Sequence, residues 1–162
     1  MRAFVALGAN LNDPVAQVQA GAAALDQLPD TRRIACSSLY RTAPVGRTDQ
    51  PDFINAVCEI ETALPAHELM RALLAIERAH DRVRDIAGGP RTLDLDLLLY
   101  GDRVLDEPGL SVPHPRLHQR AFVLYPLQEI APGLVIPGRG RVADLAAGCA
   151  GQGIERLAQR AG

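Results

Sequence analysis

Apolar and polar positions recur along the chain with two periods, and these periods predict strands and helices in a definite order. Residues 2–8 form a short apolar run that ends at Gly and Asn, as expected for a strand buried on both faces. Asp13 then stands where an N-cap would, with Pro14 at the first helical position. Apolar residues follow at three- and four-residue spacing as far as Leu25. We therefore predict a strand followed by a helix.

Three further strands and a second helix are predicted in the next part of the chain. Residues 33–41 and 53–62 are rich in β-branched and aromatic residues, and the second run alternates with a period of two. Pro65 opens a helical stretch whose apolar stripe ends near Arg82. After a Gly-Gly-Pro break, residues 92–100 form a leucine-rich strand.

This order predicts an α+β fold of the ferredoxin-like type, in which a βαββαβ core forms an antiparallel sheet with its helices on one face. The other face of the sheet would be free for a ligand. From Val104 onward we expect a C-terminal extension, with a hairpin up to Pro113, a helix around 119–129 and a short helix after Arg141. Because no repeat or low-complexity tract divides it, the chain is expected to form a single domain over residues 1–162.

Composition and charge narrow the possible classes of protein. The apolar content of 48% is enough for a buried core, and a net charge of −2 gives no general attraction to nucleic acids or anionic membranes. The apolar start is too short for a signal peptide, and no apolar run approaches the ~18 residues that cross a bilayer. We expect a cytoplasmic monomer with neither nucleic-acid nor membrane partners.

The cysteines also favour a cytoplasmic protein. Cys36, Cys58 and Cys149 are an odd number of widely spaced thiols without a C-x-x-C pair. Such spacing argues against a disulfide framework and against a zinc knuckle. We expect three buried, free thiols in a reducing compartment.

The strand over residues 92–100 carries the first candidate chemistry. Alternation places its leucines on one face: Leu93, Leu95, Leu97 and Leu99. Asp94 and Asp96 then share the other face, with Cα atoms about 6.6 Å apart. Two such carboxylates repel unless a cation lies between them, and their hard oxygens suit Mg²⁺. The alternative is the solvent-facing side of an edge strand, because a bare Asp-x-Asp is common by chance.

Three arginines in the preceding loop favour a phosphate ligand. Arg82, Arg84 and Arg91 flank the Gly-Gly-Pro break, and arginine donates to phosphate oxygens in a bidentate manner. By themselves they would be read as an ordinary solvated loop, but beside the two acids they favour a nucleoside triphosphate site. Loops 42–52 and 81–91 both exceed the ~4–6 residue median length, as active-site covers do.

Residues 53–62 carry a second candidate site. Phe53 and Asn55 share a face, so a ring and a carboxamide could stack on a flat heterocycle and bind its edge. The alternative is that Asn55 only satisfies backbone groups, and the residues alone do not decide between the two interpretations. His114 and Arg120, followed by Phe122, form a third group in the C-terminal extension.

Taken together, these segments resemble a known family, the 6-hydroxymethyl-7,8-dihydropterin pyrophosphokinases of folate biosynthesis. The most specific segment is Gly-Pro-Arg-Thr-Leu-Asp-Leu-Asp at residues 89–96. Other matching segments are Gly8-Ala-Asn10-Leu, Tyr40-Arg-Thr42-Ala-Pro44, Gln50-Pro-Asp-Phe53-Ile-Asn55-Ala, Glu77, Arg82-Val-Arg84, Val112-Pro-His114, Arg120-Ala-Phe122 and Pro126-Leu. The resemblance implies the same ferredoxin-like architecture and an ATP-dependent diphosphotransferase (pyrophosphokinase).

The resemblance also implies roles for individual residues. Two Mg²⁺ ions would bind to Asp94 and Asp96, and these acids would be catalytic together with Arg82 and Arg91. The pterin pocket would consist of Thr42, Pro44, Val45, Phe53, Asn55 and Phe122. ATP, the co-substrate, would contact Glu77, Arg82, Arg84, Arg91, Leu97, Ser111, His114 and Arg120.

The implied reaction is attack by the pterin hydroxymethyl oxygen on the β-phosphorus of ATP, which gives AMP and the pterin diphosphate. No side chain stands out as a general base, so positioning and electrostatics are expected to supply most of the acceleration. The chain departs from many relatives at Ala87 and Gly88, where a basic and an aromatic residue are common. Loop 81–91 is therefore expected to lack two ligand contacts.

Three rival functions make different demands on the residues. A nucleotidyltransferase would also use paired acids, but it would attack the α-phosphorus and release pyrophosphate. A non-catalytic ligand-binding module would need neither the acids nor the arginines. An RNA-binding module would need exposed aromatics on its central strands, and the aromatic content is only 4%.

Overall fold

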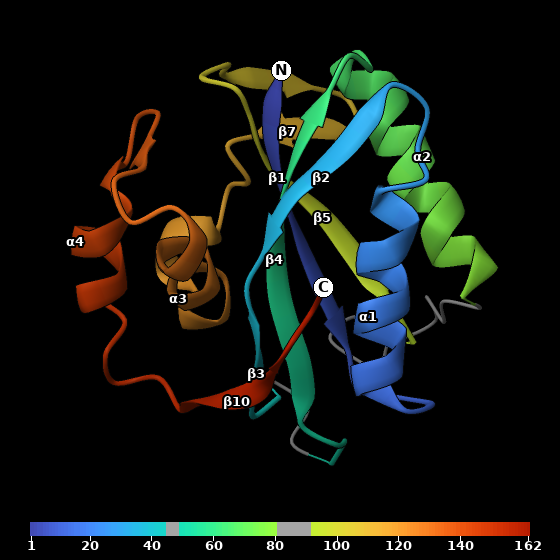
Figure 1. Ribbon diagram of the computed structural model, residues 1–162. Helices are drawn as coiled ribbons and strands as arrows, with labels where there is room; N and C mark the ends of the chain where they lie inside the picture. The colour runs from blue at the N-terminus through green and yellow to red at the C-terminus, as the bar shows by residue number, and fades with distance from the viewer. Residues whose placement is uncertain (45–48, 81–91) are drawn as a thin grey trace.

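The computed structural model describes residues 1–44, 49–80 and 92–162 (Figure 1). The strands and helices follow one another as β1 (Arg2–Ala9), α1 (Pro14–Leu25), β2 (Thr31–Cys36), β3 (Ser38–Thr42), β4 (Phe53–Thr62), α2 (Ala66–Ala79), β5 (Asp94–Tyr100), β6 (Leu105–Glu107), β7 (Leu110–Val112), the 3₁₀ turn η1 (Leu117–Gln119), α3 (Ala121–Ile130), β8 (Val135–Ile136), β9 (Gly140–Arg141), α4 (Val142–Ala147) and β10 (Ile154–Arg160). Among the helices of these described segments, none is long and apolar enough to span a membrane.

One antiparallel sheet organises the molecule. Its strands lie in the order β10-β3-β4-β1-β5, and β2 also pairs with β4. Every pair in this sheet is antiparallel. The predicted mixture of an antiparallel sheet with helices is therefore confirmed, as are the separate predictions of β1, α1, β4, α2 and β5 in this order.

The first hydrophobic core lies between the sheet and helices α1 and α2. Asp13 caps α1 as predicted, because its carboxylate accepts the N–H of Ala16 at 3.4 Å. Leu25 of α1 and Leu73 of α2 are buried in one cluster with Leu7 of β1. Helix α2 ends at Ala79, slightly before the predicted end near Arg82. Both helices thus lie on one face of the sheet, as expected.

A second core covers part of the opposite face, which was expected to be open. Phe4 and Val57 of the sheet pack there against Leu124 of α3, together with residues of α4. Figure 1 shows α3 and α4 on the opposite side of the sheet from α1 and α2. In the described chain, the C-terminal extension therefore covers part of this face and leaves another part open to a ligand.

The strand predicted over residues 33–41 is two strands, β2 and β3, which break at Ser37. Cys36 is opposite Cys58 and Tyr40 is opposite Asn55, so four steps on one strand match three on β4. The hydroxyl of buried Ser37 accepts the Val57 N–H at 3.0 Å and donates to the Ser38 carbonyl at 2.7 Å. The Ser37 hydroxyl thus accepts the Val57 N–H in place of a backbone carbonyl of the paired strand. The periodicity of the residues does not show this feature.

The prediction that Leu93, Leu95, Leu97 and Leu99 share one face is wrong for Leu99. Val5 is opposite Leu97 whereas Phe4 is opposite Leu99, so that Leu98 is an extra residue. Such a bulge reverses the alternation that follows it. Leu97 accordingly lies in the core beside α1 and α2, and Leu99 lies in the core beside α3.

The expectation of three free thiols is also wrong. Cys36 and Cys58 form a disulfide, and only Cys149 is a free, buried cysteine in the described chain. The two residues are direct partners across β2 and β4. Their distance along the sequence, 22 residues, gives no sign of this register.

Candidate active site

A cavity of about 710 Å³ opens on the half of the sheet that α3 leaves uncovered. Its walls come from β1, β3, β4, β5 and the start of α3. The described lining residues are Ala6, Leu7, Gly8, Thr42, Ala43, Pro44, Phe53, Asn55, Asp94, Asp96, Arg116, Gln119, Arg120, Ala121, Phe122, Val123, Gln152 and Gly153.

Three residues in one row form the floor of this cavity. Gly8 of β1 is paired with Asn55 of β4 on one side and with Asp94 of β5 on the other. Two residues earlier, Ala6 is paired with Asp96. A Cβ atom on Gly8 would lie 2.9 Å from Oδ1 of Asn55. The glycine therefore leaves room between the carboxamide and the first carboxylate.

Asn55 is held in one orientation at the cavity wall. Its Nδ2 donates to Oγ1 of Thr42 at 2.7 Å, and both side chains are buried. Phe53 lines the same cavity two residues earlier on the same face of β4. A ring and a fixed carboxamide in one wall can bind a flat heterocycle by stacking and by edge hydrogen bonds.

The opposite wall is the start of α3. Phe122 is half-buried there, and the guanidinium of Arg120 lies 5.4 Å from the centroid of its ring. The first turn has no cap of its own, but Gln152 supplies one from the C-terminal segment. Its Oε1 accepts the Ala121 N–H at 3.0 Å, and its Nε2 donates to the Gln119 carbonyl at 2.8 Å. Residues distant in sequence thus fix this wall.

Asp94 and Asp96 are both half-buried and line the cavity from β5. Within the described residues, no group of three or more His, Cys, Asp or Glu side chains could hold a metal ion. Two carboxylates still fit Mg²⁺, which keeps several waters and also binds substrate phosphates. The donor set therefore matches a magnesium–nucleotide complex better than an all-protein metal cage.

Glu77 of α2 supports the strand that carries both acids. It is 2% exposed, and its Oε2 accepts the N–H of Leu95 at 2.7 Å. Leu95 lies between the two aspartates, and β5 is the edge of the sheet. Glu77 therefore takes the place that a neighbouring strand would have at this point.

His114 lies close enough to Asp94 and Arg120 for both charges to affect its pKa. Burial, followed by the charges of Arg120 and Arg116, lowers the pKa of His114 despite the opposing effect of Asp94. The ring is therefore neutral at pH 7. Its Nδ1 accepts the Arg116 N–H at 3.2 Å, so the proton must reside on Nε2. His114 can thus donate one hydrogen bond to an anionic ligand.

A further buried amide connects β1 to the segment that precedes β4. Asn10 is 2% exposed, and its Nδ2 donates to Oε1 of Gln50 at 2.9 Å and to the Pro51 carbonyl at 3.0 Å. This contact anchors the end of the long loop 42–52 that was expected to cover the site.

The structure brings together many of the residues that the sequence singled out. Those in the cavity wall are Thr42, Pro44, Phe53, Asn55, Asp94, Asp96, Arg120 and Phe122. Four others lie elsewhere: Leu97 in the core beside α1 and α2, Ser111 exposed on β7, Glu77 behind β5, and His114, half-buried after β7 and within reach of the charges of Asp94 and Arg120. Four lie outside the described residues: Val45, Arg82, Arg84 and Arg91.

Sequence reasoning missed Arg116, Gln119 and Gln152 as lining residues. The position of Arg116 and Gln119 between His114 and Arg120 was a usable signal, because that segment was already expected near the ligand. Gln152 gave no such signal, since it follows a short helix in a glycine-rich stretch far along the chain.

Comparison with known proteins gives concordant matches. The model of the family described as 7,8-dihydro-6-hydroxymethylpterin-pyrophosphokinase (HPPK) matches residues 4–132. The chain is 50% identical over 156 residues to the 2-amino-4-hydroxy-6-hydroxymethyldihydropteridine pyrophosphokinase of Pseudomonas aeruginosa, covering 96% of each chain. It is 46% identical over 143 residues to the protein of that name from Haemophilus influenzae, covering 88% of this chain and 89% of that one.

Solved structures support the fold. The crystal structure of a triple mutant of Plasmodium falciparum HPPK-DHPS matches with a TM-score of 0.70 at 14% sequence identity. The match covers 91% of this chain and 43% of that chain, so the protein spans less than half of the solved one. At this identity the likeness concerns the fold alone.

Proposed function

Since the chain belongs to the 7,8-dihydro-6-hydroxymethylpterin-pyrophosphokinase family, and is thus a pyrophosphokinase of folate biosynthesis, we propose that it transfers diphosphate from ATP to 6-hydroxymethyl-7,8-dihydropterin. AMP and the pterin diphosphate are the products. The reaction requires Mg²⁺, and Asp94 and Asp96 bind two ions.

The observation that carries this proposal is the row formed by Asn55, Gly8 and Asp94 across three strands. A carboxamide that is fixed by Thr42 faces the same cavity as two carboxylates. A heterocycle bound to Asn55 and a phosphate chain bound above the acids would therefore meet over Gly8.

The protein contributes to the reaction mainly by orientation and by charge. The heterocycle stacks between Phe53 and Phe122 with its edge on Asn55, so that its hydroxymethyl oxygen points toward the acids. Arg120 neutralises charge on the phosphates, and the Nε2–H of His114 donates a hydrogen bond to them, as the bond to the leaving AMP breaks. When bound, two Mg²⁺ ions would offset the charge that develops on the attacking and leaving oxygens.

The remaining assignments complete this proposal. Arg82 and Arg91 are catalytic and, with Arg84, contact the triphosphate; Val45 closes the pterin pocket; Glu77, Leu97 and Ser111 assist on the nucleotide side. The match to the family's segments supports the roles of Glu77 and the three arginines. The strand order β3-β4-β1-β5, with two crossover helices, supports the assignment of a ferredoxin-like βαββαβ core. We further propose a cytoplasmic monomer in which residues 1–162 form one pyrophosphokinase domain.

The proposal is tested by incubating the chain with ATP, Mg²⁺ and the hydroxymethyl dihydropterin and identifying the products. AMP and the pterin diphosphate are expected. Free pyrophosphate would instead indicate a nucleotidyltransferase, and an absence of ATP consumption would overturn the proposal.

Asp94→Asn and Asp96→Asn should each lower turnover by on the order of 10²–10³-fold, because a neutral amide cannot balance the cation charge. The far-UV circular dichroism spectrum should not change. Asp102→Asn is a matched control, since Asp102 is exposed in the turn after β5. Normal turnover in either cavity variant would refute the metal assignment.

A further inference from the structure

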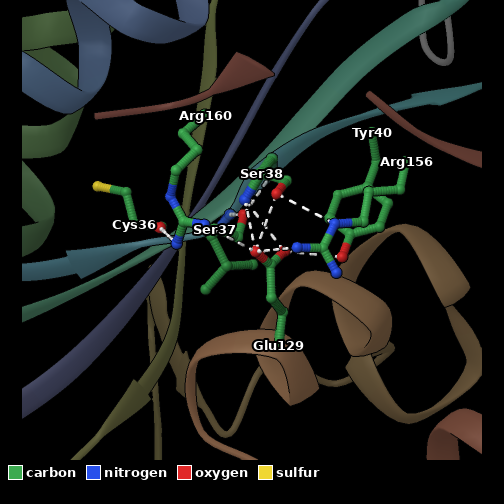
Figure 2. A network of polar contacts seen from close by, with 8 residues as sticks. Cys36, Ser37, Ser38, Tyr40, Glu129, Arg156 and Arg160 are labelled. Carbon is green, nitrogen blue, oxygen red and sulfur yellow. Dashed lines mark hydrogen bonds and ion pairs between the residues drawn. The ribbon is translucent and has the colours of Figure 1, made fainter. Parts of the chain in front are cut away.

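Glu129, in the last turn of α3, connects three elements through one carboxylate (Figure 2). Its side chain is 10% exposed. From β3, the Ser38 N–H donates to both oxygens at 3.0 and 3.1 Å, the Ser38 hydroxyl to Oε2 at 2.9 Å and the Tyr40 hydroxyl to Oε1 at 2.8 Å. From β10, Arg156 donates to Oε2 at 3.1 Å, and Arg160 approaches it to 3.4 Å.

Two of these elements, α3 and β3, continue into the walls of the cavity. Phe122 precedes Glu129 by seven residues, or about two helical turns, so both project from the same side of α3. Thr42 follows Tyr40 by two residues, so both project from the same face of β3. Glu129 and Tyr40 therefore join α3 to β3 at one point, and Phe122 and Thr42 lie on the same sides of these two elements farther along, at the cavity.

We propose that Glu129 is a positioning residue that sets the spacing between the two walls of the pterin pocket. One wall is Phe122 on α3. The other is Thr42 on β3, which in turn holds the Asn55 carboxamide. A hydrogen-bonded carboxylate fixes this spacing better than apolar packing does, because its bonds are directional. The inference rests on the proposed function, in that it requires the cavity to bind a pterin.

The network does not touch the reacting centre. Asp94 and Asp96 lie on β5, which is separated from β3 by β4 and β1. A change at Glu129 should therefore alter how tightly the pterin is held, while the chemistry of a correctly bound pterin is preserved. An anchor with a purely structural role would lower the amount of folded enzyme without altering the KM of what remains.

The variant that tests this is Glu129→Gln, assayed by steady-state kinetics with ATP saturating. The KM for the pterin should rise roughly tenfold, whereas kcat should stay within about threefold of the wild-type value. Glu155→Gln is the matched control, because Glu155 also joins β10 to β3, through an exposed ion pair with Arg41 at 2.8 Å. Its KM should remain that of the wild type.

An unchanged KM in Glu129→Gln, or an equal rise in Glu155→Gln, would overturn the inference. Tyr40→Phe provides a second measurement should Glu129→Gln not fold, since it removes one hydrogen bond to the carboxylate and keeps the buried ring. Its KM should rise by about threefold, and an unchanged value would count against the inference. A wild-type chain that forms no AMP would refute the proposed function instead.

Discussion

At the scale of single residues, Gly8 determines how the two ends of the site face each other. It has a cross-strand partner on each side, Asn55 and Asp94. A methyl group at this position would approach Oδ1 of Asn55 to 2.9 Å, which is too close for an ordinary contact. Asn55 cannot move aside without losing its hydrogen bond to Thr42. The absence of a side chain at residue 8 is therefore a condition for the fixed carboxamide.

Gly8→Ala should weaken pterin binding by about 1–3 kcal/mol, because the displaced Asn55 leaves a polar edge of the ligand without its partner. The measurement is isothermal titration calorimetry with the pterin. Gly133→Ala is the control, since a Cβ there would meet no atom within 4 Å. Equal pterin affinities of the wild type and Gly8→Ala would show that Asn55 does not contact the ligand in this orientation.

The site was predictable from sequence where its residues lie on regular strands. Asn55, Asp94 and Asp96 follow from alternation, because successive side chains of a strand point to opposite faces. Arg116 and Gln152 do not, because neither belongs to a periodic segment and the approach of Gln152 to α3 depends on the path of the whole extension. The contacts of Arg82, Arg84 and Arg91 stay predictions.

At the scale of elements, the same distinction separates the strands that were predicted from those that were missed. Strands β1 and β4 are covered on both faces, so they contain long apolar or alternating runs. Strand β10 (Ile154–Arg160) lies at an edge and buries no residue fully, which leaves a polar sequence without period. The break at Ser37 and the extra residue Leu98 depend on pairing with a neighbour, which a single strand does not encode.

The Cys36–Cys58 disulfide fastens the end of β2 to the middle of β4, and it predicts a thiol count. When the chain is alkylated at lysis and unfolded without reductant, one cysteine per molecule should be modified, namely Cys149. Reduction should expose three and should lower the free energy of unfolding by about 2–4 kcal/mol. Cys149→Ser should bring the count without reductant to zero. Three modified cysteines before reduction would contradict the disulfide.

At the scale of the whole molecule, one sheet serves two cores, and Glu129 connects the elements of the second core to the sheet and to the end of the chain. Burial alone would raise the pKa of Glu129, but the hydrogen bonds from Tyr40 and Ser38 and the charge of Arg156 outweigh it and lower this pKa below the ordinary 4.5. Burial and the hydrogen bond to Glu129 raise the pKa of Tyr40, so that its hydroxyl remains a donor at neutral pH.

The lowered pKa of Glu129 determines how its contribution to the free energy of unfolding changes with pH. The unfolded carboxylate takes up its proton near pH 4.5 and the folded one only at lower pH, so the stabilisation is complete above pH 4.5 and is lost as the pH falls through the folded pKa. The melting temperature of Glu129→Gln should therefore lie below that of the wild type at pH 7. The difference should shrink below about pH 4.5, as thermal melts followed by circular dichroism at several pH values would measure.

Glu155→Gln, which removes an exposed ion pair, should melt close to the wild type throughout this range. If the difference between Glu129→Gln and the wild type persisted undiminished to pH 3, the ionised form of Glu129 would not be the source of the stabilisation.

The extra residue Leu98 divides β5 into two halves, and the alternation of side chains between the two faces of the sheet is reversed from one half to the other. The first half keeps both acids toward the ligand, and the second distributes Leu99 and Tyr100 between the two cores. Deleting a residue from either half, other than the extra residue itself, would bring the rest of that half out of register, because a shift by one turns the side chains to the opposite face. During divergence this strand should therefore accept replacement of its leucines by other apolar residues, while it rejects a change of length in either half.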